Sequence, residues 1–229
     1  MKILVFTDVH GNLSALTALS KTDEFKTADK RIFLGDIVVG YSRPNECIEL
    51  LSALDCKCLL GNNDSYVCDH IPEEELKAQP PHKILQMQYF EKNVSSENKD
   101  MIMSWEKDYT LNVLGKTFYF THYPWETEDN VVESPEINTL ESRQKMFEYI
   151  KSDYIIFGHE HMSNVFKDEK KLYYCLGSLG LRNPSPYLMI EVTEEDIRLE
   201  EKFVTNNLDL EIDLLKKAGY PYNKNKLKK

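Results

Sequence analysis

The chain has 229 residues, of which 41% are hydrophobic and 29% are charged, and its formal net charge is −10. This balance allows one buried core over residues 1–229 and excludes a largely disordered chain. The negative charge argues against a stable nucleic-acid partner, because it repels a polyphosphate backbone, but it leaves small anionic substrates open. No apolar stretch approaches the ~20 residues of a membrane helix, so we expect a cytoplasmic protein with no membrane partner.

Three apolar segments near the N-terminus each run directly into a polar cluster. The first, Lys2–Phe6, is rich in β-forming residues, and an asparagine after it is expected to cap a helix over residues 14–20. The second, residues 31–36, precedes a proline that can begin another helix with one apolar face. The third, residues 58–60, ends at a Gly-Asn-Asn-Asp sequence. Strands that alternate with helices predict a partly parallel sheet.

The segment of about 65–108 is helix-rich and acidic, and we expect it to be an insertion near the functional site. Beyond it, alternating residues around a Leu-Gly turn predict a β-hairpin over residues 110–122. A helix near 140–150 and an apolar strand over 153–157 follow, and two further hairpins are expected after that strand. The tail of about 220–229 ends in basic residues and is expected to fray.

Polar side chains of seven residues follow these apolar strands. Asp8 and His10 are two residues apart, so the period of a strand lets both face one site. Taken alone, this pair is better explained as a loop aspartate beside a surface histidine. However, His159 and His161 repeat the spacing after another strand, and two imidazoles on one side of a strand seldom suit a core. The remaining members of the set are Asp36, Asn62 and His122.

These carboxylates, imidazoles and one amide oxygen are typical of a metal site. If these groups were ordinary polar residues of the core, each would need its own hydrogen-bond partner, whereas one metal ion satisfies several groups. Nitrogen and oxygen donors without thiolate favour Mn, Fe, Zn, Co or Ni over Ca, and seven donors are too many for one tetrahedral zinc. The economical interpretation is two divalent ions sharing a carboxylate, with Mn favoured and Fe, Zn, Ni, Co or Mg as candidates. A single-metal or structural site is the minor alternative.

Six short motifs lie between Asp8 and Gly180, and five of them contain these candidate ligands. The motifs are Asp8-Val9-His10-Gly11-Asn12, Gly35-Asp36, Gly61-Asn62-Asn63-Asp64, Thr121-His122, Gly158-His159-Glu160-His161 and Gly177-Ser178-Leu179-Gly180. In the content and order of these motifs the chain resembles the calcineurin-like metallophosphoesterases. The resemblance implies an α/β (α+β) fold, a four-layer αββα sandwich in which two mixed β-sheets are flanked by helices.

The resemblance also implies how the ligands divide between two metal ions. One ion would be held by Asp8, His10, Asp36 and His161, and the other by Asp36, Asn62, His122 and His159. Asp36 would bridge the ions, roughly 3.5 to 4 Å apart as in other two-metal sites. Such ions lower the pKa of a bound water, so that a bridging hydroxide can attack phosphorus in line. Asp36 and His122 would therefore serve catalysis as ligands in a phosphoester hydrolase.

Asn63 departs from the family pattern, because many relatives carry at this position a histidine that helps to protonate the leaving oxygen. Asparagine cannot act as a general acid, although it can donate a hydrogen bond to a phosphate. We therefore expect small phosphorylated substrates with good leaving groups: phosphodiesters, dinucleoside polyphosphates and other nucleotides, or activated aryl esters. Arg43, near the Asp36 loop, is a candidate phosphate ligand, with a solvent-exposed arginine as the alternative.

A protein of another class also stays open, namely a scaffold or binding protein that keeps the fold with little or no turnover. Asn63 permits that interpretation, and the complete set of candidate ligands argues against it. Aromatic side chains near the ligands could stack on a base, although packing in the core or at an interface is favoured. These side chains are Tyr66, Tyr89, Trp105, Tyr123 and Trp125. The sequence sets no oligomeric state.

Overall fold

The computed structural model describes residues 1–69, 80–125 and 138–219, which form two five-stranded sheets. In the first sheet the strand order is β10 (Ile197–Val204), β9 (Ser185–Val192), β1 (Lys2–Phe6), β2 (Lys30–Phe33) and β3 (Lys57–Cys58). In the second sheet it is β4 (Asp108–Val113), β5 (Lys116–Thr121), β6 (Tyr154–Phe157), β8 (Leu172–Cys175) and β7 (Asn164–Lys167).

Both sheets are mixed. In the first, β1, β2 and β3 run parallel, β9 is antiparallel to β1, and β10 is antiparallel to β9. In the second, β5, β6 and β8 run parallel, while β4 and β7 pair antiparallel at the two edges. Parallel strands bring their carboxyl ends to one edge of a sheet, where ligand sites form in α/β proteins.

The two sheets pack face to face around a buried apolar layer. Ile3 and Val5 of β1 point into this layer, where they join Phe118 of β5. The alternate residues of β1, Leu4 and Phe6, pack instead with the helices that cover the first sheet. Because successive side chains of a strand point to opposite faces, one short strand contributes to two interfaces.

Seven helices pack around the outer face of the first sheet within the described residues, and each contributes to one apolar cluster. They are α1 (Leu13–Ser20), α2 (Asp23–Thr27), α3 (Pro44–Ala53), α4 (Asn62–Cys68), α6 (Pro81–Asn93), α7 (Ser96–Met103) and α9 (Leu208–Lys217). The expected cap of α1 is confirmed, since Asn12 Oδ1 accepts the Ala15 N–H at 2.9 Å. The proline start of α3 is confirmed as well.

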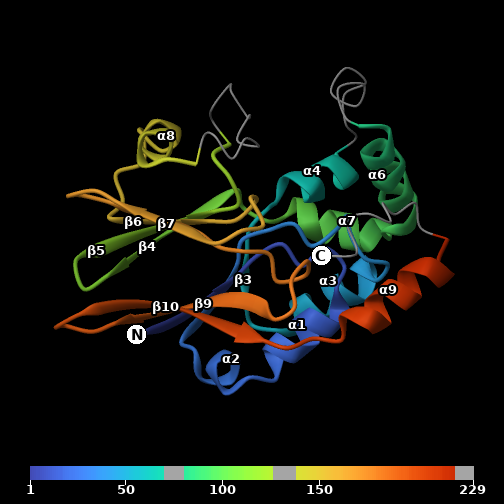
Figure 1. The fold of residues 1–229 in the computed structure, drawn as a ribbon, viewed down its shortest axis with the longest axis horizontal. Coiled ribbons are helices and arrows are strands. Elements are labelled where there is room, and N and C mark those ends of the chain that lie inside the picture. Colours follow the sequence, from blue (N-terminus) through green and yellow to red (C-terminus); the bar gives the residue numbers. More distant parts are fainter. Residues whose placement is uncertain (70–79, 126–137, 220–229) are drawn as a thin grey trace.

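A single helix, α8 (Leu140–Met146), covers the outer face of the second sheet within the described residues. Its C-cap residue Phe147 packs with Ile155 and Phe157 of β6 and with Tyr173 of β8. Figure 1 shows α8 on one side of the two sheets, and α1 and α2 on the other. This arrangement confirms the expected four layers, helix, sheet, sheet and helix.

Several boundaries differ from the sequence-based expectations. The helix expected near 140–150 ends at Met146, and the strand expected over 58–60 is Lys57–Cys58, followed by a single bridge from Leu59. The helical segment expected from about residue 65 begins at Asn62, a candidate ligand. α9 is not among the predicted helices. Residues 70–79 of the expected insertion and the tail 220–229 lie outside the described residues.

None of the helices in the described part of the chain has the length and apolar character needed to cross a membrane.

Candidate metal centre

The candidate ligands gather where strands of both sheets end. From the first sheet, Asp8 and His10 follow β1, Asp36 follows β2, and Asn62 opens α4 just after β3. From the second sheet, His122 follows β5 directly, and two histidines follow β6. Residues from distant parts of the chain therefore meet at one edge of the sandwich, because the parallel strands of each sheet end there.

Five of these residues hold their backbone in the left-handed region, which non-glycine residues seldom adopt. They are Asp8, His10, Asp36, His159 and His161, with φ between 50° and 72°. This conformation costs an L-residue about 1–2 kcal/mol, so the surrounding contacts must enforce it. Hydrogen bonds between loops contribute: the Asp8 N–H donates to the Gly35 carbonyl at 2.9 Å, and the His10 N–H to the Asp36 carbonyl at 3.0 Å.

One group of donors, here called the first donor group, consists of Asp8, His10, Asp36 and His161. Their potential ligand atoms all lie within 4.8 Å of one another. Asp8 Oδ1 is 3.2 Å from His161 Nε2 and 3.5 Å from His10 Nε2. The other carboxylate oxygen, Asp8 Oδ2, accepts the Thr7 hydroxyl at 2.7 Å and the His159 N–H at 3.2 Å. Asp8 is thereby oriented with one oxygen toward the imidazoles.

The second donor group consists of Asp36, Asn62, His122 and His159. Asn62 Oδ1 lies 3.1 Å from His122 Nε2 and 2.9 Å from His159 Nδ1. Asp36 Oδ2 lies 3.4 Å from His122 Nε2 and 3.9 Å from His10 Nε2 of the first group. Asp36 therefore stands between the two donor groups and is common to both.

The burial and hydrogen bonding of the donor atoms fit divalent metal ions. Within the described residues, Asp8 Oδ1 is buried without a hydrogen-bond partner, which is costly for a carboxylate oxygen unless a cation or donor satisfies it. The Nε2 atoms of His10 and His161 lie 3.1 Å apart. A proton shared between them would satisfy this contact, but it would leave Asp8 Oδ1 as it is. The His10 ring is fixed from behind, because its Nδ1 lies 3.0 Å from the Val38 carbonyl, as outer contacts fix metal-bound histidines.

Residues 1–195 match the Calcineurin-like phosphoesterase superfamily domain. The chain belongs to this superfamily. Protein MJ0912 of Methanocaldococcus jannaschii, described as uncharacterized, is 29% identical over 187 residues, which are 82% of this chain and 73% of that protein.

Two solved structures share the fold of this phosphoesterase domain. The hypothetical protein PH1004 from Pyrococcus horikoshii OT3 superposes with a TM-score of 0.82 at 17% identity, over 99% of this chain and 96% of that chain. A metallophosphoesterase from Sphaerobacter thermophilus superposes with a TM-score of 0.71 at 20% identity, also over 99% and 96% of the two chains. At these identities the likeness establishes the fold alone.

In the phosphoesterase domain, buried charges shift the titration of the candidate ligands. Burial lowers the pKa of His122, but the Asp36 and Asp8 carboxylates outweigh it and raise that pKa to about 9. Burial likewise lowers the pKa of His10, and its contacts with Asp8 and Asp36 raise it to about 8. For His159, burial and the charge of His122 lower the pKa to about 4. Two imidazoles of the metal-free site therefore hold protons at neutral pH and must release them to bind metal.

Asp64 anchors the Asp36 loop, a role that the sequence did not reveal. Its Oδ2 accepts the N–H groups of Asp36 at 2.7 Å and Gly61 at 3.1 Å. Its Oδ1 accepts those of Ile37 at 2.9 Å and Val38 at 3.2 Å. Burial and the charge of Asp36 raise the pKa of Asp64 to about 7, against these backbone contacts, which lower it. In the sequence, the feature that could have indicated this role is the position of Asp64 directly after two asparagines in the same polar cluster.

The glycine before each of two candidate ligands allows the loops to approach closely. A Cβ on Gly61 would lie 2.2 Å from both the Asp36 backbone nitrogen and Asp36 Oδ1. Gly35 has φ of +114°, and a Cβ there would lie 2.5 Å from the Gly61 nitrogen. A residue without a Cβ is therefore needed at both turns.

Asn63 and Arg43, the predicted substrate-binding residues, make contacts within the protein. The Asn63 side-chain amide donates to Asp36 Oδ2, and its backbone N–H donates to Asp36 Oδ1 at 2.9 Å. The Arg43 guanidinium pairs with the buried carboxylate of Glu211 in α9 and donates to Ser14 Oγ at 3.3 Å. Neither contact tests a role toward substrate, so both roles stay predictions.

Among the aromatic side chains considered for base stacking, Tyr123 contacts a candidate ligand directly. Its ring stacks on the His159 imidazole with centroids 5.3 Å apart. Trp125 lies against Tyr123 at 4.4 Å between centroids and also packs on the helical core. Tyr89 and Trp105 pack against the same core, as the favoured explanation expected, and Tyr66 is half-buried in α4.

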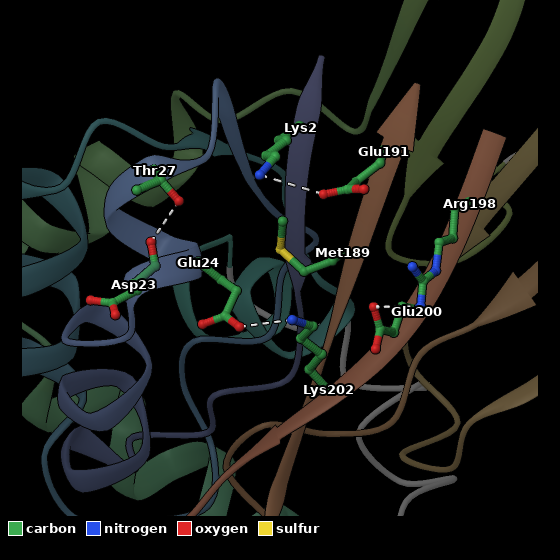
Figure 2. A pocket seen from close by; sticks show the side chains of 9 residues that line it. All are labelled: Lys2, Asp23, Glu24, Thr27, Met189, Glu191, Arg198, Glu200 and Lys202. Atoms are coloured by element: carbon green, nitrogen blue, oxygen red, sulfur yellow. Dashed lines mark hydrogen bonds and ion pairs between the residues drawn. The ribbon is translucent and has the colours of Figure 1, made fainter. Parts of the chain in front are cut away.

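A hollow of about 230 Å³ lies elsewhere, between α2, β1, β9 and β10 (Figure 2). Its charged side chains pair with one another, Lys202 with Glu24 at 2.8 Å and Lys2 with Glu191 at 3.5 Å. Lys2 begins β1, whereas Asp8 follows the carboxyl end of that strand. The hollow is thus at the opposite end of the sheet from the candidate ligands and carries no comparable donor set.

Proposed function

We propose that this chain is a metal-dependent phosphoesterase that binds two divalent ions and hydrolyses phosphodiester or phosphoanhydride bonds of small substrates, nucleotides among them. The observation that carries the proposal is Asp36, a buried carboxylate within reach of His122 on one side and His10 on the other. A structural metal site has no need of a carboxylate shared by two donor groups.

The first donor group would hold one ion and the second donor group the other, with Mn favoured and Fe, Zn, Ni, Co or Mg as candidates. When bound, such a pair of ions lowers the pKa of a coordinated water and stabilises the negative charge that develops on the phosphate oxygens. The protein contributes the fixed positions of the donors, because their loops are bonded to each other and to Asp64.

Asn63 determines the substrate class in this proposal. It occupies the position from which a histidine would protonate the leaving oxygen, and an amide has no proton to give at neutral pH. Substrates whose leaving group is already a weak base, such as a phosphate or an aryl oxide, need no such proton. This argument favours dinucleoside polyphosphates and activated diesters over alkyl phosphomonoesters.

A non-catalytic scaffold of the same fold is the second candidate, and the Asn63 contact with Asp36 favours it. The amide donates to Asp36 Oδ2, the oxygen that would otherwise face both donor groups. Against this candidate stands Asp8 Oδ1, a buried oxygen that has no hydrogen-bond partner among the described residues and would need none if a cation were bound. Without a metal, the charge of that oxygen would be met only by the neighbouring imidazoles of His161 and His10, at 3.2 and 3.5 Å.

The decisive experiment is elemental analysis of the purified chain combined with a substrate panel under Mn²⁺, Ni²⁺, Zn²⁺ and Mg²⁺. The panel should include bis-aryl diesters, diadenosine polyphosphates, cyclic nucleotides and phosphoserine. We expect about two ions per chain and hydrolysis that EDTA abolishes. Metal binding without turnover of any substrate would favour the scaffold, and faster turnover of phosphoserine than of diesters would contradict the substrate class.

A further inference from the structure

The guanidinium of Arg143, on α8, is fully buried beneath the loop that carries two of the candidate ligands. Its Cζ lies 5.1 Å from the ring centroid of Phe157, the last residue of β6, and 5.9 Å from that of Phe166 on β7. Stacking on two aromatic rings fixes the plane of the guanidinium and leaves its nitrogens directed at the neighbouring loop.

The loop places the carboxylate of Glu160 beside this guanidinium. Arg143 Nη2 donates to Glu160 Oε2 at 2.7 Å, and Nη1 lies 2.5 Å from Glu160 Oε1. Nη2 also donates to Asn138 Oδ1 at 2.8 Å, and Asn164 Nδ2 donates to Glu160 Oε2 at 3.1 Å. The Glu160 side chain is only 14% exposed, so the ion pair is largely removed from water.

Glu160 lies in sequence between His159 and His161, and the two histidines serve different donor groups. His159 lies against Asn62 in the second group, whereas His161 lies against Asp8 in the first. Both histidines have left-handed backbone, with φ of 72° and 60°. Glu160 therefore lies between one residue of each donor group.

We propose that Arg143 is a positioning residue, which holds the His159–His161 loop in its ligating conformation by gripping Glu160. The inference rests on the proposed metal-dependent function and adds to it a residue that touches neither metal nor substrate. It makes α8, in the outer layer of the sandwich, part of the apparatus that shapes the centre.

Stability alone does not account for this pair. A buried ion pair contributes little net stability, because removing both charges from water offsets most of their attraction, and apolar residues of similar volume often serve as well. What an arginine and a glutamate add is a charged hydrogen bond from Nη2 to Oε2, with a second nitrogen, Nη1, beside the other carboxylate oxygen. Lysine could supply the charge without the fork or the stacking, so Arg143→Lys should not substitute fully.

The test measures Mn²⁺ affinity by calorimetry and thermal unfolding of the EDTA-treated protein, for the wild type and four variants. Arg143→Met leaves Glu160 without its partner, and Glu160→Gln removes the charge from the other side. The double variant Arg143→Met/Glu160→Gln removes both charges together. Arg198→Met is the matched control, since that arginine is 65% exposed and pairs with Glu200 at 3.4 Å.

We expect both single variants to bind Mn²⁺ roughly 10- to 100-fold more weakly, the range for lost outer contacts of metal ligands. The double variant should recover much of the thermal stability lost in Arg143→Met but not the affinity, a separation that a purely structural pair would not produce. The control should match the wild type in both measurements.

Wild-type Mn²⁺ affinity in any folded variant that lacks the Arg143–Glu160 pair would overturn the positioning role. If none of the three variants folds, the pair maintains the whole domain and the specific role is likewise overturned. If the wild type itself binds no Mn²⁺, the proposed function fails, which is a separate and recognisable result.

Discussion

The side-chain amide of Asn63 donates a hydrogen bond to Oδ2 of Asp36, the carboxylate that stands between the two donor groups. The backbone N–H of Asn63 donates to the other oxygen of the same carboxylate, at 2.9 Å. Asn63 thus holds Asp36 with two donors, and its own Oδ1 is buried with no hydrogen-bond partner in the part of the chain that the structure describes. The side chain at this position supports the carboxylate and supplies no acidic proton.

Replacing this amide by an imidazole should therefore change the range of leaving groups. We expect Asn63→His to raise kcat/KM for an alkyl phosphomonoester by about 10²-fold, the lower end of what general acid catalysis supplies. Turnover of an activated aryl diester, which needs no proton on its leaving group, should change far less. Steady-state kinetics on the two substrates measures the ratio.

Asn63→Ala is the control for that substitution, because it removes the amide without adding an acid. It should show no gain on the monoester. Equal gains by the alanine and histidine variants would mean that release of Asp36, and not proton donation, limits the reaction.

Asp36→Asn should depress the occupancy of both metal ions together. An amide carries no charge and bridges two cations poorly, so we expect elemental analysis to fall from about two ions per chain to well below one, with activity reduced more than ~100-fold. Asp213→Asn, at an aspartate that is 64% exposed, is the matched control and should keep both ions. Retention of one tightly bound ion in Asp36→Asn would support a single-metal site.

Metal binding should release protons at neutral pH. His10 and His122 have pKa values of about 8 and about 9 in the metal-free site, whereas metal coordination requires neutral imidazoles. Apparent Mn²⁺ affinity should therefore rise with pH up to about 9. Calorimetry at pH 7 in buffers of different ionisation enthalpy measures the protons released, and a heat that is independent of the buffer would contradict the assignment.

The metal-free protein should show the opposite trend in stability. Since the pKa values of these two histidines lie above the ordinary 6.5, their contribution to folding is fully present below pH 6.5. It is lost as pH rises through about 8 and 9. We expect the free energy of unfolding of the EDTA-treated protein, measured in urea, to fall over that window, and a rise there would refute the shifts.

Gly61→Ala should disturb the centre through backbone contact. The added Cβ would lie 2.2 Å from Asp36 Oδ1, so the Asp36 loop must move, and overpacking of this kind costs about 1–3 kcal/mol or more. Gly115→Ala is the control for steric contact, because Gly115 has open space around it, although its φ is +77° whereas that of Gly61 is −94°. Urea denaturation should show the larger loss for Gly61→Ala, and only that variant should lose metal affinity.

Local sequence was sufficient wherever short-range chemistry decides the outcome. Asn12 and Pro44 begin their helices because a side-chain cap and a fixed φ act within one turn. The hairpin around Gly115 forms because alternation and a turn residue act between neighbouring strands. The motif residues also named the candidate ligands, since carboxylates and imidazoles after apolar strands have few other uses.

Other features depended on contacts between segments far apart in the chain. No local pattern could tell that Asp64 would accept four backbone N–H groups of two loops, or that Glu211 of an unpredicted helix would take the Arg43 guanidinium. The same holds for Arg143, which reads as an ordinary surface residue of a short helix until α8 packs on the second sheet. Sequence alone determined which side chains could bind metal, because that is a property of each side chain. Only the tertiary structure decided which groups hold them in place, because burial and hydrogen bonding arise when distant strands and helices pack together.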